Sequence, residues 1–359
     1  MIKWTTSNSI GVEFNEKGAI NSMFEKLWME LKKKNFAPLY FLYGPETFLI
    51  EETKQLMIKE GLTEEELDFN LSSYDLEETP IEIALEDAET FPFFGERKFV
   101  FLHNPFFLTA EKNKSKVEHD VKKLENYIME PASYTSIIFI GHFDKTDDRK
   151  KIVKELKRQA KVVEASRLNE QDLKKWLVRR ANFQKVQILP EAIDLIIKLS
   201  GTNLSILTSE VDKLALYVGE KETITPEVVE LLVTRSLEQN IFALTEKIVE
   251  KNREEAISIY RDLLLQKEEP IKILAAISSS LRIIYQTKEL SRRGYSQTQI
   301  ASHLKVHPYR IKLAMGQAQK FSEEEIMKIM QSLATADYQM KTGGMNKELI
   351  IELILLQLK

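Results

Sequence analysis

Hydrophobic and polar positions change their spacing along the chain, and this divides it into an alternating part and a helical part. In the first part, short apolar runs beside glycine or proline, typical of buried strands, alternate with stretches of helical periodicity. The predicted strands are residues 38–43, 69–74, 99–102, 136–140 and 160–164, and the predicted helices are residues 24–34, 46–61, 80–89, 115–129 and 148–158. This alternation indicates a mostly parallel sheet covered on both faces. We therefore expect an α/β domain over residues 24–166.

After Arg167 the pattern is helical, and no further strand is expected. Four helices are predicted at residues 169–183, 190–199, 204–218 and 226–235, with Gly201 and Gly219 at helix ends. Later helices are predicted from a cap at Asn240, from Pro270 to Arg293, and over residues 297–304, 307–321, 323–341 and 347–358. The expectation is two all-α domains, a small one over residues 167–236 and a larger one over residues 237–359.

Residues 1–23 have weak, mixed patterning, and Met23 and Met29 offer internal starts, so we expect a leader and a candidate non-native extension. The 359 residues are 43% hydrophobic and 30% charged, which is typical of a globular protein with a sizeable core. Absence of cysteine excludes disulfides, thiol nucleophiles and cysteine metal sites. Because no signal peptide or membrane span is visible, a cytoplasmic location is expected.

The sequence contains no recognisable motif for binding a nucleotide or a metal ion. The turn after the first strand reads Gly44-Pro45-Glu46-Thr47-Phe48, without a second glycine or a Gly-Lys-Ser/Thr, and Glu46 would repel phosphate at a helix N-terminus. No acidic pair that would hold magnesium ends the strand at residues 136–140. The histidines are scattered, at positions 103, 119, 142, 303 and 307, and the last two are expected to flank a turn. No catalytic, nucleotide or metal site and no cofactor is predicted.

Three phenylalanines crowd a proline and a glycine in the sequence FPFFGERK, residues 91–98, just before a predicted strand. Turns normally use polar residues beside glycine, so this apolar loop is either folded onto the core or kept at the surface for a partner. Both alternatives stay open from the local sequence.

Residues 295–312 have the apolar spacing of a helix-turn-helix with a basic second helix. Residues 282–320 hold eight Lys and Arg and one acidic residue, a local charge of +7 in a chain whose formal net charge is -4. Such a patch can contact phosphates, and the candidate contacts are Arg292, Arg293, Arg310 and Lys312. The alternative is two short helices joined by a turn in a bundle, with solvated basic faces.

Five stretches together resemble the delta subunit of the bacterial DNA polymerase III clamp loader of the Gram-positive type. They are YGPETFL (residues 43–49), DAETFPFFGER (87–97), SLEQNIF (236–242), EEPIK (268–272) and LKVHP (304–308). The resemblance implies a three-domain subunit: an AAA+-like α/β domain, a helical lid that with it forms a nucleotide-binding module without a phosphate loop, and a helical collar for oligomerisation. It also implies a non-catalytic role in the polymerase holoenzyme.

In this family the delta subunit binds the ring-shaped sliding clamp (beta) and opens one interface of the ring for loading on primed DNA. The implied partners are the clamp, the tau/gamma and delta-prime subunits, and primer-template DNA within the complex. The family's clamp-binding element has two adjacent hydrophobic residues before a small and a basic one, which here falls on Phe93, Phe94, Gly95 and Arg97. Pro92 and Gly95 are expected to shape the loop, and Phe91 to pack inward.

Two other functions are weighed against this one. A DNA-binding transcription regulator would use the helix-turn-helix-like segment 295–312 to read a duplex sequence. An active ATPase would need the nucleotide site that the glycine turn at Gly44 fails to provide.

Overall fold

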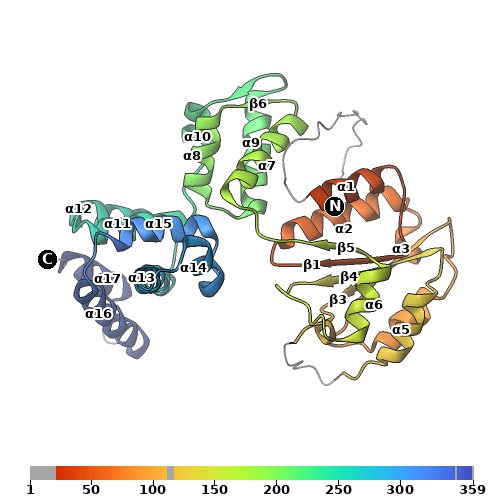
Figure 1. The fold of residues 1–359 in the computed structure, drawn as a ribbon. Coiled ribbons are helices and arrows are strands. Elements are labelled where there is room, and N and C mark those ends of the chain that lie inside the picture. Colours follow the sequence, from red (N-terminus) through yellow and green to blue (C-terminus); the bar gives the residue numbers. More distant parts are fainter. Residues whose placement is uncertain (1–21, 111–116, 344–345, 358–359) are drawn as a thin grey trace. The chain divides into compact units, whose positions relative to one another are not determined.

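The computed structural model describes residues 22–110, 117–343 and 346–357, and the chain forms two compact units, Met1–Ser166 and Arg167–Lys359 (Figure 1). The predicted leader lies outside the described residues as far as Asn21, and helix α1 (Ser22–Lys32) starts directly after it. Within the described residues, no helix is both long and apolar enough to span a membrane.

The first unit is built on a five-stranded sheet in the order β2-β3-β4-β1-β5, with every neighbouring pair parallel. The strands are β1 (Leu39–Tyr43), β2 (Leu71–Asp75), β3 (Lys98–His103), β4 (Thr135–Gly141) and β5 (Lys161–Glu164). All residues of β1 and β4 are buried, as a sheet covered on both faces requires. The predicted fold class, an α/β domain with a mostly parallel sheet followed by helical domains, is confirmed.

Helices cover both faces of this sheet, as Figure 1 shows. They are α1, α2 (Thr47–Gly61), α3 (Leu67–Asn70), α4 (Ile81–Ala88), α5 (Val121–Met129) and α6 (Lys151–Gln159), with a 3-10 turn η1 (Phe106–Leu108). Successive side chains of β1 point to opposite faces of the sheet. Leu39, Phe41 and Tyr43 therefore pack in one core cluster with residues of α4, α5 and α6. The opposite face of the sheet lies under α1 and α2. Burial of both faces therefore fixes the strand register.

Several predicted boundaries in this unit are wrong, and two of them have a visible structural cause. The strand expected from Phe69 starts at Leu71, because residues 67–70 form the short helix α3. The helix expected from residue 115 starts at Val121, where the Asp120 carboxylate accepts hydrogen bonds from the backbone of Lys122 and Lys123 and caps it. The start predicted for it, residue 115, lies outside the described residues.

The second unit begins with α7 (Glu170–Phe183), α8 (Pro190–Ser200), α9 (Leu204–Val218) and α10 (Pro226–Leu232). It also contains two short parallel strands, β6 (Gln187–Ile188) and β7 (Thr223–Ile224), so the expectation of no strand after Arg167 is wrong. Strands of two residues are too short to give a periodic signal. Gly201 and Gly219 end α8 and α9 with φ values of 85° and 88°, as predicted.

Within the described residues, seven helices complete this unit, among them the long α13. They are α11 (Leu237–Val249), α12 (Arg253–Leu265), α13 (Pro270–Arg292), α14 (Gln297–Leu304), α15 (Pro308–Ala318), α16 (Glu323–Thr342) and α17 (Lys347–Leu356). Pro270 lies in the first turn of α13, as predicted. Asn240 is not a cap: Ser236 caps α11, and Asn240 is a buried residue inside it whose amide donates to the Arg235 carbonyl.

Gly44 connects β1 to α2 in a conformation that a side chain would not tolerate. Its φ is 139°, and a Cβ there would lie 2.4 Å from the Ala165 carbonyl oxygen. We expect Gly44→Ala to lower the free energy of unfolding by roughly 3 kcal/mol or more in urea titrations followed by circular dichroism. The control is Gly294→Ala, at φ 85°, where the added methyl meets no described atom within 4 Å, with an expected cost of about 1 kcal/mol. Equal costs would contradict the close approach.

Candidate functional site

The apolar loop between α4 and β3 lies at the surface. Phe93 is 70% and Phe94 52% exposed, so of the two alternatives left by the sequence the structure shows the surface patch. Helix α4 ends at Ala88, before Pro92, which is half-buried. Adjacent aromatic rings exposed to water on a tight loop are unusual, and such an exposed apolar patch indicates a surface that contacts a partner.

A third ring joins this pair from α3. Phe69, 53% exposed, stacks on Phe93 with centroids 5.2 Å apart and meets Phe94 edge-on at 5.6 Å. The Phe93 and Phe94 rings are perpendicular, with centroids 4.7 Å apart. We call Phe69, Phe93 and Phe94 the aromatic cluster. Offset and edge-to-face contacts of this kind stabilise ring positions beyond simple area burial.

The other members of the predicted motif lie differently. The expectation that Phe91 packs inward is wrong: it is 78% exposed and stacks on Tyr134 at 4.5 Å, because the hydroxyl of Tyr134 is anchored on the Glu89 carbonyl beside it. Arg97 is half-buried, lies over the Phe36 ring and donates to Ser136 Oγ at 3.2 Å. Arg97 therefore supports the loop from within.

The backbone under the aromatic cluster is held by one buried amide. Asn70 is 0% exposed, its Oδ1 accepts from the Phe93 amide at 3.0 Å, and its Nδ2 donates to the Phe94 carbonyl. Gly95 follows with φ 69°, and a Cβ there would lie 1.6 Å from Glu66 Oε1. A left-handed glycine and two hydrogen bonds thus define the course of the loop at the rings.

Lys98 anchors the far end of the loop. Its buried Nζ donates to the Asp87 carbonyl at 2.9 Å, to Thr90 Oγ1 at 2.8 Å and to the Asp87 carboxylate. Burial alone would raise the pKa of Asp87, but hydrogen bonds from Lys98 and Ser72 outweigh it and hold this pKa below its usual value. The end of α4 and the start of β3 are therefore tied together below the exposed rings.

The glycine turn after β1 has its backbone donors engaged. The Gly44 amide donates to the Gly141 carbonyl and the Glu46 amide to the Ala165 carbonyl, both at 2.9 Å. A phosphate loop presents such amides to its ligand instead. No group of three or more His, Cys, Asp or Glu side chains within the described ranges is arranged to hold a metal ion.

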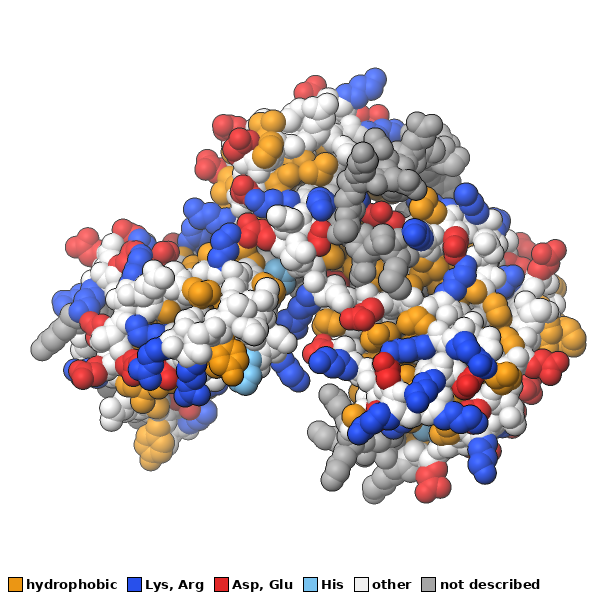
Figure 2. Space-filling view, viewed as in Figure 1, with side chains coloured by type: hydrophobic (Ala, Val, Ile, Leu, Met, Phe, Trp, Pro, Cys, Tyr) orange, Lys and Arg blue, Asp and Glu red, His pale blue; other side chains and the backbone are white. Residues whose placement is uncertain are grey.

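The basic side chains proposed for DNA contact all have acidic partners. Arg292 pairs with Glu289 and Glu323, and Arg293 with Glu289. On α15, Arg310 pairs with Glu238 at 2.8 Å and Lys312 with Glu170 at 2.9 Å. Blue and red side chains are accordingly interspersed over this unit in Figure 2. The local charge of +7 is thus offset by acidic residues that are mostly distant in sequence, and contact with DNA stays a prediction.

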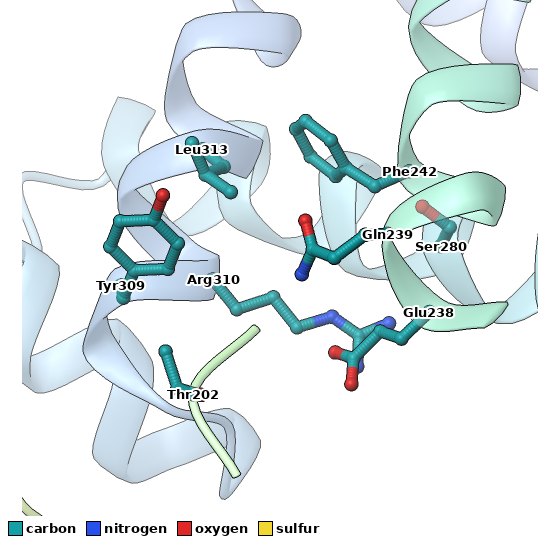
Figure 3. Close-up of a pocket in the computed structure, with 8 residues that line it drawn as sticks. All are labelled: Thr202, Glu238, Gln239, Phe242, Ser280, Tyr309, Arg310 and Leu313. Atoms are coloured by element: carbon teal, nitrogen blue, oxygen red, sulfur yellow. The ribbon is translucent and has the colours of Figure 1, made fainter. Parts of the chain in front are cut away.

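The helix-turn-helix-like segment packs onto the start of its own unit. His307 caps α15, accepting from the Tyr309 amide at Nδ1, while Nε2 contacts the Leu168 carbonyl at 2.6 Å. Next to it, Arg310 extends toward Glu238 beside a cavity of about 10 Å³, room for about one water (Figure 3). The basic second helix is therefore engaged in packing, and the cavity is too small for a nucleotide.

Comparison with known proteins agrees with this arrangement. Family models described as "DNA polymerase III, delta subunit" and "DNA polymerase III delta subunit, C-terminal domain" match residues 40–166 and 238–358, and one described as "middle domain" matches residues 169–231. DNA polymerase III subunit delta of Bacillus subtilis is 49% identical over 92% of this chain and 96% of its own length. The chain belongs to the DNA polymerase III delta subunit family.

Structural similarity to this family extends over nearly the whole chain. A solved structure described as Bacillus subtilis DNA clamp loader delta protein is 48% identical, covers 93% of this chain and 99% of its own, and has a TM-score of 0.79. A probable DNA polymerase III subunit delta of Aquifex aeolicus is 25% identical over 58% of this chain and 59% of its own length. The predicted resemblance to the delta family is confirmed.

The sequence predicted Phe93 and Phe94 as a site, and the structure places both rings at the surface, but Phe69 and Asn70 were not predicted as site residues. Both missed residues were assigned to a regular strand, in which alternate side chains face opposite ways. The available signal was local: acidic residues at Glu64, Glu65 and Glu66 and again at Asp68 are unfavourable in a central strand and indicate a turn or helix start.

Removing Lys98 should destabilise the chain by leaving the Asp87 carboxylate without its buried partner. We expect Lys98→Met to lower the free energy of unfolding by roughly 3 kcal/mol in urea titrations. The matched control is Lys157→Met, which breaks the exposed pair with Asp148 and should cost less than about 1 kcal/mol. Similar small losses in both variants would show that Lys98 does not anchor the loop.

His307 should make stability depend on pH. Burial lowers its pKa from the ordinary value of 6.5, against the opposing effect of the Leu168 carbonyl. Below about pH 6.5 the unfolded chain binds a proton at His307 more readily than the folded chain does. The contribution of His307 to the free energy of unfolding is therefore full above about pH 6.5 and falls as the pH drops below that value. His307→Asn keeps a capping acceptor without the titration. Between about pH 7.5 and pH 5.5 the wild type should lose more unfolding free energy than this variant; parallel curves would contradict the assignment.

Proposed function

We propose that this delta-family chain binds the sliding clamp through Phe93 and Phe94 and opens the ring for loading on primed DNA, without hydrolysing ATP itself. The observation that carries the proposal is that two adjacent aromatic rings, at the positions of the family's clamp-binding pair, are exposed on a loop whose backbone is fixed from below. Membership in a family of clamp-loader subunits implies partners in a clamp-loader complex.

The energetics of such a contact are favourable. Burying each ring in an apolar groove contributes roughly 1.5 to 3 kcal/mol. The rings already contact each other, and their backbone is held by Asn70, so less conformational freedom is lost on binding. A few rigid aromatic side chains at the centre of an interface commonly carry most of its binding energy.

Ring opening needs no chemistry by this chain. A protein that binds the open form of a ring more tightly than the closed form shifts the equilibrium toward the open form by its difference in affinity. The energy therefore comes from the contact made by the aromatic rings. In the proposed cycle, ATP bound by neighbouring tau/gamma subunits controls when this contact is available.

The turn after β1 supports the absence of ATP hydrolysis in the proposal. Gly44 and Glu46 use their amides on carbonyls of the same unit, and Glu46 precedes the N-terminus of α2, where a phosphate would otherwise be placed. A nucleotide would have to displace these hydrogen bonds and accept a carboxylate beside its phosphates.

The helices from α11 to α17 are proposed as the collar that joins the tau/gamma and delta-prime subunits. A hollow of about 430 Å³ between α12 and α17 is lined by Arg261, Leu264, Leu265, Glu348 and Glu352. Leu265 is 82% exposed there, which is unfavourable in a chain without a neighbour. Primer-template DNA is expected to contact this chain only within the assembled complex.

Replacing both rings tests the proposal directly. We expect Phe93→Ala with Phe94→Ala to abolish capture of purified sliding clamp in a pull-down, because the central apolar contact is removed. Both side chains are exposed, so the free energy of unfolding should change by less than about 1 kcal/mol. Phe183→Ala, an exposed ring on α7, is the control and should bind normally. Unchanged capture by the double variant would overturn the proposed function.

A further inference from the structure

The aromatic cluster is wider than the pair that the family motif contains. Phe69 comes from α3, outside the loop that carries Phe93 and Phe94, yet it stacks on one of these rings and meets the other edge-on. All three rings are at least half exposed, at 53%, 70% and 52% in chain order. A partner that covers Phe93 and Phe94 therefore meets the ring of Phe69 at the same surface.

The residue after Phe69 controls how the other two rings are presented. Asn70 is fully buried and uses both ends of its amide, as an acceptor for Phe93 N–H and as a donor to the Phe94 carbonyl. A buried amide that loses its partners is costly, so this geometry is strongly preferred over others. One dipeptide, Phe69-Asn70, thus supplies a third ring and the bonds that orient the first two.

Acidic side chains border the cluster. Glu66 lies against Gly95, and the exposed acidic neighbours in the chain are Glu64, Glu65, Asp68 and Glu96. The nearby cations are withdrawn from this surface, because Lys98 is buried on Asp87 and Arg97 lies over Phe36. The surface is therefore apolar at its centre and negative at its edge, which fits an apolar groove with Lys or Arg side chains at its rim.

We propose that the Phe69-Asn70 dipeptide is the second half of the clamp-docking surface. Phe69 is its third contact ring, Asn70 is the positioning residue that orients Phe93 and Phe94, and the groove that receives them has a basic rim. This inference rests on the proposed function, since it takes the sliding clamp as the partner.

The third ring is tested by measuring clamp affinity with surface plasmon resonance. We expect Phe69→Ala in the full chain to raise the Kd at least about tenfold while Phe183→Ala leaves it unchanged. If Phe69→Ala binds like the wild type and the Phe93→Ala, Phe94→Ala variant does not, the third ring is disproved and the proposed function stands. If all these variants bind like the wild type, the proposed function itself fails.

The positioning role of Asn70 needs a readout besides affinity. Asn70→Ala should raise the Kd and speed hydrogen exchange at the Phe93 amide, while the amides of β3 and β4 keep their protection. Asn70→Asp keeps the acceptor for Phe93 N–H but loses the donor, and should give a smaller loss of protection there. If Asn70→Ala unfolds the first unit, the positioning role of Asn70 is judged from Asn70→Asp alone. If Asn70→Asp protects the Phe93 amide from exchange as well as the wild type does and binds the clamp with normal affinity, the positioning role is overturned.

The basic rim is tested by charge reversal. Asp68→Lys combined with Glu96→Lys should slow association with the clamp at low salt, and the difference should shrink at about 0.5 M NaCl, where surface charges are screened. Glu222→Lys, an exposed acidic residue in the second unit, is the control for a general charge effect. Association rates equal to or faster than those of the control would show that the rim of the groove is not basic.

Discussion

Exposed aromatic rings can stay at a defined place only if buried polar bonds hold the backbone beneath them, and this constraint organises the first unit. Water offers no force that fixes an apolar loop, and collapse onto the core would bury the rings. Here the amide of Asn70 holds the loop at the rings, and the ammonium group of Lys98 holds it where β3 begins. Both groups are buried and hydrogen-bonded, so moving the loop would leave polar groups unpaired.

The parallel sheet provides the rigid base for these bonds. Its central strands are buried on both faces, and neighbouring strands are in register from β2 to β5. Because β2 starts directly after Asn70 and β3 starts at Lys98, the two anchors lie at the starts of adjacent parallel strands. The loop is thereby fixed to the most regular part of the unit, which is how scaffolds commonly present binding residues.

Much of the fold followed from periodicity, and the errors have identifiable physical causes. The helices α9 and α14 were predicted to the residue, and the buried strand β4 was predicted to within one residue at each end. The strands β6 and β7 were too short to show a pattern. Asn240 was mistaken for the cap of α11 because the true cap, Ser236, was placed before the start of the helix.

In the site, the pair Phe93 and Phe94 was visible in the sequence, whereas Asn70 acts through contacts with residues more than twenty positions away. The pairing of Arg310 and Lys312 with distant glutamates was likewise invisible to a count of local charge.

The glycine turn after β1 has a consequence for how this chain responds to its surroundings. A protein whose folded form binds a ligand becomes more stable as the ligand concentration rises. In this turn the amides of Gly44 and Glu46 already donate hydrogen bonds to carbonyls of their own unit. These carbonyls are the acceptors that the phosphates of a bound nucleotide would otherwise provide. On the proposed function, the thermal stability of this subunit is then independent of the cellular nucleotide pool, and it remains a constant part in an assembly whose other subunits change with ATP.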